Sequence, residues 1–181
     1  MNKTFLNVVL IILAMIGGKL FSQHFITATQ YKTFTSDLGG YSVLIPTDTE
    51  SKVETINILS GSITGDAQSA IDYNLGIKFS VHHFKMPAFL MSSANPDKVL
   101  KTMSDDFISW ANGTILSDQK TEFRSFPGRE CSVKKSDGKT VKMKVFMVRD
   151  KIYQMIVYCK SADSGNKRIG QFFDSFNLTK I

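Results

Sequence analysis

Residues 137–160 read DGKTVKMKVFMVRDKIYQMIVYCK, and this stretch decides the fold. Apolar residues recur at every second position in both halves, which is the period of a half-buried strand. Asp137-Gly138 has the chemistry of a tight hairpin turn, and Arg149-Asp150-Lys151 separates the two halves. Together with a strand over 129–133, these residues predict an antiparallel meander of three strands.

The register of this meander follows from the apolar alternation. If both turns have three residues, one face holds Cys131, Val133, Val141, Met143, Val145, Met147, Tyr153, Met155, Val157 and Cys159. The two cysteines then lie on the outer strands, about 9 to 10 Å apart sideways. A disulfide needs Cα atoms within about 7 Å, so we predict buried free thiols. A bridge is the alternative, because exported thiols are commonly oxidised.

The rest of the chain predicts more strands and two helices. Strands are expected over 41–45, 53–59, 70–74 and 77–84, with a plain turn at 60–66. A helix begins at Asn95-Pro96-Asp97, ends at Asn112-Gly113 and carries an apolar stripe made of Val99, Leu100, Met103, Phe107 and Trp110. A closing helix over 164–174 turns Ile169, Phe172, Phe173 and Phe176 inward. This mixture predicts an α+β domain.

The N-terminus has the three parts of a secretory signal peptide. A short positive start precedes the apolar run Phe5–Ile16, and Gly17-Gly18 breaks that run. The run is 12 residues long with only Asn7 interrupting it, which is shorter than the roughly 20 residues that cross a bilayer, so we expect no permanent span. The prediction is a signal peptide over 1–22, cut after Ser22 or Gly18, and a single periplasmic or secreted domain over 23–181. An uncleaved anchor helix is the alternative.

The charge of the chain is mildly basic. The 22 Lys and Arg against 16 Asp and Glu give +6, and removing residues 1–22 takes away Lys3 and Lys19, which leaves 20 minus 16, or +4. A small net positive charge is compatible with association with an anionic surface. Nucleic acid is not expected as a partner, because the basic residues form no cluster and only four are arginine: Arg124, Arg129, Arg149 and Arg168.

Two stretches near the C-terminus resemble the end of PsbP-like domains, the type named for an extrinsic subunit of photosystem II. They are Asp150-Lys-Ile-Tyr153-Gln and Phe172-Phe-Asp-Ser-Phe-Asn-Leu178, which match a strand reading x-Tyr-x-Leu and a helix that ends in Ser-Phe. Ile45-Pro46 is similar to the end of the family's opening strand. The resemblance implies an antiparallel sheet of about six strands with helices packed on it. It also implies a non-enzymatic accessory or binding protein.

The outer face of the meander is the candidate partner surface. Lys134, Lys142, Lys144 and Tyr158 gather there, with Phe146 among them. Exposed lysines beside aromatic rings can meet an anionic partner, a glycan or a lipid headgroup. A solvated face, or one partly covered by a helix, is the alternative.

Two further contact sites are candidates. A pocket between the first helix and the sheet could bring His83, Phe107 and Trp110 around an apolar ligand. The apolar loop over 87–93 could contact a partner, with core packing as its alternative.

No pattern in the chain indicates catalysis. Ser60–Asp66 resembles a nucleophile or phosphate loop only superficially, because Asp66 stands where an anion would sit. His82 and His83 point to opposite faces of a strand, so one metal ion cannot easily take both. We therefore expect no enzymatic activity, no cofactor and no metal.

The sequence thus predicts an exported accessory or binding domain whose partner is an envelope or extracellular protein or an anionic surface. The alternative is a small-molecule or lipid carrier, or less readily an enzyme, that uses the pocket at the first helix.

Overall fold

The computed structural model describes residues 28–58, 61–87 and 95–179. Seven antiparallel strands form the main sheet in the order β3-β4-β5-β9-β8-β7-β6. Their bounds are β3 Thr49–Ile58, β4 Gly61–Asp72, β5 Ile77–Lys85, β6 Gly113–Phe123, β7 Phe126–Lys135, β8 Lys139–Val148 and β9 Lys151–Lys160. A small second sheet, ordered β1-β2-β10, consists of β1 Tyr31–Ser36, β2 Tyr41–Pro46 and β10 Asn177–Leu178.

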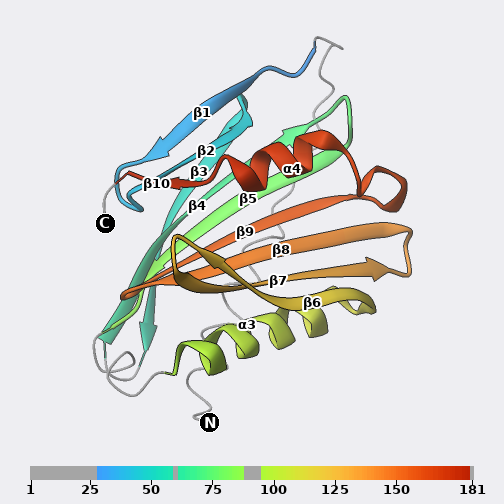
Figure 1. The fold of residues 1–181 in the computed structure, drawn as a ribbon. Coiled ribbons are helices and arrows are strands. Elements are labelled where there is room, and N and C mark those ends of the chain that lie inside the picture. The colour runs from blue at the N-terminus through green and yellow to red at the C-terminus, as the bar shows by residue number, and fades with distance from the viewer. Residues whose placement is uncertain (1–27, 59–60, 88–94, 180–181) are drawn as a thin grey trace.

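Two helices complete three layers (Figure 1). Helix α3, Pro96–Ala111, covers one face of the main sheet. Helix α4, Lys167–Asp174, follows a 3₁₀ turn and shares the other face with the small sheet. The α+β prediction is confirmed, but the expected sheet of about six strands is in fact seven strands plus a separate sheet of three. Neither of these helices is long and apolar enough to cross a membrane.

Some predicted segments lie outside the described residues. These are the signal peptide over 1–22 and all of the 87–93 loop except Pro87.

The register between β8 and β9 differs from the predicted one. Val148 pairs with Lys151, so the turn holds only Arg149 and Asp150, and Arg149 adopts a left-handed φ of 56°. Shortening the turn by one residue moves every β9 side chain to the opposite face. The first turn does have three residues, as predicted, because Lys134 pairs with Thr140.

This register buries the main sheet on both faces. Toward α3 lie Val133, Val141, Met143, Val145, Ile152 and Ile156. Toward α4 and the small sheet lie Tyr153, Met155, Val157 and Cys159, with Phe79, Phe146 and Phe172. The prediction that both apolar sets share one face is therefore wrong. Because β9 is apolar on both sides, its pattern fits either register equally well.

The two cysteines lie on opposite faces of the sheet. Cys131 belongs to the core under α3, whereas Cys159 belongs to the core under α4. Both thiols are free and buried, so the free-thiol prediction is confirmed although the shared face is not. Burial raises the pKa of the Cys131 thiol to about 12 and raises that of Cys159 as well.

We expect neither thiol to react while the protein is folded. Iodoacetamide at about pH 8 reacts with an exposed thiolate. Burial blocks access to these thiols, and the raised pKa keeps them protonated. Mass spectrometry should show no adduct on the native protein and two adducts after denaturation. Rapid alkylation of the native protein would contradict this arrangement. So would a denatured protein that takes up no adduct because its thiols are bridged.

Local capping fixes helix α3 where the sequence predicts it. The Asn95 side chain accepts a hydrogen bond of 3.2 Å from the Lys98 amide, and Pro96 occupies the first turn. The helix ends at Asn112, whose φ of 47° is left-handed. Its stripe of Leu100, Met103 and Phe107 is fully buried against the sheet.

The predicted turn over 60–66 is wrong from Gly61 onward, because 61–66 belongs to β4. Glycine and small polar residues suggest a turn, but here they allow a close strand contact. A Cβ on Gly65 would lie 2.3 Å from the backbone oxygen of His83 on β5. The absence of a side chain at Gly65 therefore lets β4 and β5 approach.

Candidate functional site

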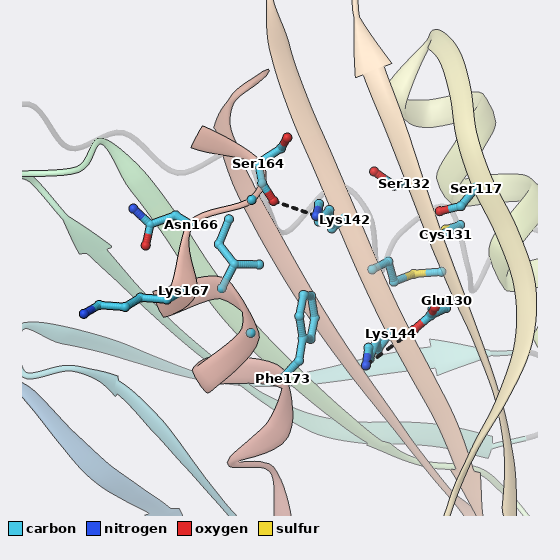
Figure 2. Close-up of a pocket in the computed structure, with 14 residues that line it drawn as sticks. Ser117, Glu130, Cys131, Ser132, Lys142, Lys144, Ser164, Asn166, Lys167 and Phe173 are labelled. Carbon is cyan, nitrogen blue, oxygen red and sulfur yellow. Dashed lines mark hydrogen bonds and ion pairs between the residues drawn. The ribbon is translucent and has the colours of Figure 1, made fainter. Parts of the chain in front are cut away.

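A cavity of about 350 Å³ opens between α4 and strands β7 and β8. We call it the α4 groove. Its sheet side is lined by Glu130, Ser132, Lys142 and Lys144, and its helix side by Ser164, Gly165, Asn166, Ile169 and Phe173. Figure 2 shows these two sides facing each other.

Helix α4 lies beside β2 of the small sheet and reaches the main sheet through Phe172. Phe172 is fully buried, and its ring centroid lies 5.1 Å from that of Phe79 on β5. Phe173, one position further round the helix, is only half-buried and forms the wall of the groove. Helix α4 thus faces the polar side chains of β7 across the cavity.

Lys142 crosses the upper part of the groove. Its Nζ donates a hydrogen bond of 2.7 Å to the backbone oxygen of Ser164, just before α4 (Figure 2). Within the described part of the chain, no carboxylate lies within ion-pair distance of this ammonium. Lys142 therefore brings an unneutralised positive charge to a half-buried position.

Ser132 is the cross-strand partner of Lys142 and points to the same face. The residue is only 8% exposed, and its hydroxyl has no hydrogen-bond partner among residues 28–58, 61–87 and 95–179. Buried hydroxyls normally have such a partner. The groove thus has a polar floor with an unused donor.

Lys144 is neutralised by its own cross-strand partner, Glu130. Their Nζ and Oε2 atoms are 3.4 Å apart, and the other Glu130 oxygen accepts from Gln119. The Lys144 ammonium also lies 5.4 Å from the centroid of the Phe173 ring. Lys142, Lys144 and Glu130 together carry a net charge of +1.

The structure brings together only part of the predicted partner surface. Lys142 and Lys144 meet in the groove, and Lys134 lies exposed on the same face without lining it. Tyr158 lies on the opposite face, paired with Val141 and packed against the α3 core, because of the two-residue turn. The face that carries Lys142 and Lys144 is partly covered by α4, which agrees with the alternative interpretation.

The predicted pocket at the first helix is not formed by its three residues. His83 shares a face with Phe79 and Val81, but α3 packs on the other face. Phe107 is fully buried in the α3 core, and Trp110 is partly buried beside it with ring centroids 5.7 Å apart. The sheet therefore separates His83 from both aromatic residues.

His83 instead belongs to a buried polar network centred on Asp66. The carboxylate accepts hydrogen bonds of 2.8 Å from Ser36 Oγ and 3.3 Å from the Tyr41 hydroxyl, and one of its oxygens lies 2.8 Å from His83 Nδ1. Burial raises the pKa of Asp66, but these hydrogen bonds outweigh it and hold the pKa below its usual range. Ser36 contacts the carboxylate and not the imidazole, and a carboxylate of lowered pKa is a weak base for activating its hydroxyl. The network joins the small sheet to the main one.

His82 points to the opposite face from His83, as predicted. Burial lowers the pKa of His82 to about 4, which keeps its ring neutral near pH 7. Across the described ranges, no group of three or more His, Cys, Asp or Glu side chains is arranged to hold a metal ion.

No family model matches this chain, and no curated protein matches it in sequence. Among solved structures, it is similar to a protein of Bacteroides thetaiotaomicron VPI-5482, with 14% identity and a TM-score of 0.48. That match covers 82% of this chain and 48% of the other, so the chain spans about half the length of the Bacteroides protein.

A second similar structure is the cyanobacterial PsbP of Synechocystis sp. PCC 6803, with 13% identity and a TM-score of 0.51. The match covers 89% of this chain and 99% of that one. The resemblance predicted from the meander and the last helix is confirmed at the level of the fold: this chain folds like cyanobacterial PsbP.

Proposed function

We propose that the protein is an exported, non-enzymatic accessory domain that binds an envelope or extracellular partner through the α4 groove. The observation that carries this proposal is Lys142, a half-buried ammonium with no described carboxylate beside it at the edge of a 350 Å³ cavity. Such a charge attracts an anionic group of a partner. The signal-like N-terminus and the PsbP-like fold support export and an accessory role.

The state of the candidate nucleophiles supports a binding role over catalysis. Cys131 and Cys159 are buried thiols with raised pKa values, and Ser36 donates to a carboxylate. A nucleophile needs a neighbouring base or a lowered pKa. The two thiols have neither among the described residues, and the base beside Ser36 is Asp66, whose lowered pKa makes it a weak one.

Photo-crosslinking in the cells that produce the protein tests the proposed function. A photoreactive residue at Lys167, which is exposed on the rim and points away from Lys142 in Figure 2, should capture one partner. Lys142→Gln combined with Lys144→Gln should reduce the crosslinked product about tenfold, because both ammonium groups are lost. A photoreactive residue at Lys98, on the far helix α3, is the matched control and should capture no such product.

Two results would contradict the proposal. One is an equal yield of the same product from Lys98 and Lys167. The other is a yield from Lys167 that the double variant leaves unchanged although the protein stays folded.

A further inference from the structure

We infer that the floor of the α4 groove is a carboxylate-binding site formed by Ser132 Oγ and Lys142 Nζ. This inference rests on the proposed function and deepens it, because it names the chemical group that the groove holds. It is argued from an unused donor, an unneutralised charge, the local charge balance and the shape of the cavity.

The hydroxyl of Ser132 is the first argument. Ser132 is 8% exposed as a residue, and its buried hydroxyl has no partner in the described part of the chain. Burying a hydroxyl without a hydrogen bond is unfavourable. Figure 2 shows Ser132 lining the cavity with its oxygen on the side of Lys142. A rotation of the Ser132 side chain toward the cavity would let a ligand oxygen accept the hydrogen bond that the fold leaves unmade.

The ammonium of Lys142 is the second argument. One of its three protons is donated to the Ser164 carbonyl, which anchors the ammonium and leaves two for a ligand. Ser132 and Lys142 face each other across β7 and β8, so their Cβ atoms lie about 5 Å apart. Two donors on one side of a cavity, one of them charged, fit the two oxygens of an oxyanion.

The charge balance selects a carboxylate over a phosphate. Glu130 neutralises Lys144, which leaves one positive charge on Lys142. A carboxylate brings one negative charge and makes the cluster neutral. A phosphate monoester near pH 7 brings almost two, and the excess would face the Glu130 carboxylate. The site therefore fits a monoanion.

The apolar wall and the volume describe the rest of the ligand. Ile169 and the Phe173 ring line the helix side of the groove. A cavity of about 350 Å³ is at the small end of ligand sites, so it suits a small acid with an apolar body. The same carboxylate could come from a free organic acid or from the end or an acidic side chain of a partner polypeptide.

The test is a titration of the ¹⁵N-labelled protein followed by amide chemical shifts. The probe is 3-phenylpropionate, and its matched controls are 3-phenylpropionamide, which lacks the charge, and phenyl phosphate, which has a higher charge. We expect saturable shifts at Ser132, Lys142 and Phe173 with the carboxylate, and at least about tenfold weaker binding of both controls.

Variants assign the binding to the two donors. Ser132→Ala and Lys142→Met should each weaken binding of 3-phenylpropionate about tenfold or more. Ser136→Ala in the exposed 136–138 turn and Lys160→Met at the exposed end of β9 should leave it unchanged. Ser132→Ala should not lower the melting temperature, because it removes a hydroxyl without a partner. Loss of binding in a variant of undiminished stability separates ligand recognition from folding.

Three results would overturn the inference: equal binding of the carboxylate and the amide, tighter binding of phenyl phosphate, or unchanged binding in both donor variants. If any of these results is found while the Lys167 crosslink persists and depends on Lys142, the carboxylate site is wrong and the proposed function is retained. If 3-phenylpropionate binds as expected and no partner is captured, the carboxylate site survives alone.

Competition identifies the source of the carboxylate when both results are positive. If 3-phenylpropionate displaces the crosslinked partner, the partner's own carboxylate occupies the floor. If the partner is captured equally well with the site saturated, the occupant is a free organic acid. Either result supports the carboxylate site.

Discussion

Replacing Gly128 with alanine will destabilise the protein by about 3 kcal/mol and lower its melting temperature by about 10 °C. Gly128 lies in β7 opposite Phe146. A Cβ at this position would stand 2.4 Å from Cδ1 of that ring and 2.7 Å from the backbone oxygen of Val145. Phe146 cannot easily move away, because its ring packs against Phe123 and Phe176 at centroid distances of 5.5 and 6.1 Å.

Gly170→Ala is the matched control for this substitution. Gly170 lies inside α4, and a Cβ there meets nothing within 4 Å. Alanine is the better helix former by about 1 kcal/mol, so this variant should be slightly stabilised. Thermal and urea unfolding followed by circular dichroism measure both. A Gly128→Ala protein as stable as the wild type would show that β7 and Phe146 are less tightly packed than described.

The free energy of unfolding will fall by about 3 kcal/mol between pH 6.5 and pH 4 because of His82 alone. Burial, and then the positive charge of Lys78, lower the pKa of His82 to about 4 from the ordinary value of 6.5. Between these two values the unfolded chain binds a proton at this ring and the folded chain does not. The contribution is therefore fully present above pH 6.5 and is lost as the pH falls toward 4.

His82→Leu isolates this effect. Neither ring nitrogen of His82 has a hydrogen-bond partner within the described ranges, so leucine leaves no polar group unpaired. Urea unfolding of both proteins at several pH values gives the difference between them, in which the other titrating groups cancel. That difference should grow as the pH falls, in favour of the variant. Parallel stability curves would mean that the pKa of His82 is the same in the folded and the unfolded protein.

Local chemistry made helix α3 predictable, whereas the sheet register depended on more distant packing. Asn95 and Asn112 act within one turn of the helix they cap, so a short stretch of sequence contains their whole signal. The register of β9 depends on which layer covers each face, and a strand that is apolar on both sides carries no such information. Strand β6 was not predicted because most of its side chains are exposed, which removes the apolar alternation.

The same reasoning explains which part of the candidate site could be predicted. Lys142 and Lys144 alternate with buried residues within one strand, so their shared face follows from the sequence. The face on which Tyr158 lies depends on the length of the turn between β8 and β9. Whether His83 lies near α3 depends on which face of the sheet that helix covers. Ser132 gave no signal of its own, because a serine in a strand attracts attention only once its burial and missing partner are known.

The pairing of β2 with β10 has a consequence for the order in which the protein can fold. Leu178, near the end of the chain, pairs with Tyr41, and Thr179 donates a backbone hydrogen bond to Gly40. A ribosome makes residues 41–46 long before β10, so the small sheet stays incomplete until residues 177–178 have been made. Contacts between such distant residues also form slowly. Until β10 is made, β2 keeps one edge unpaired, and an unpaired edge can pair with another chain.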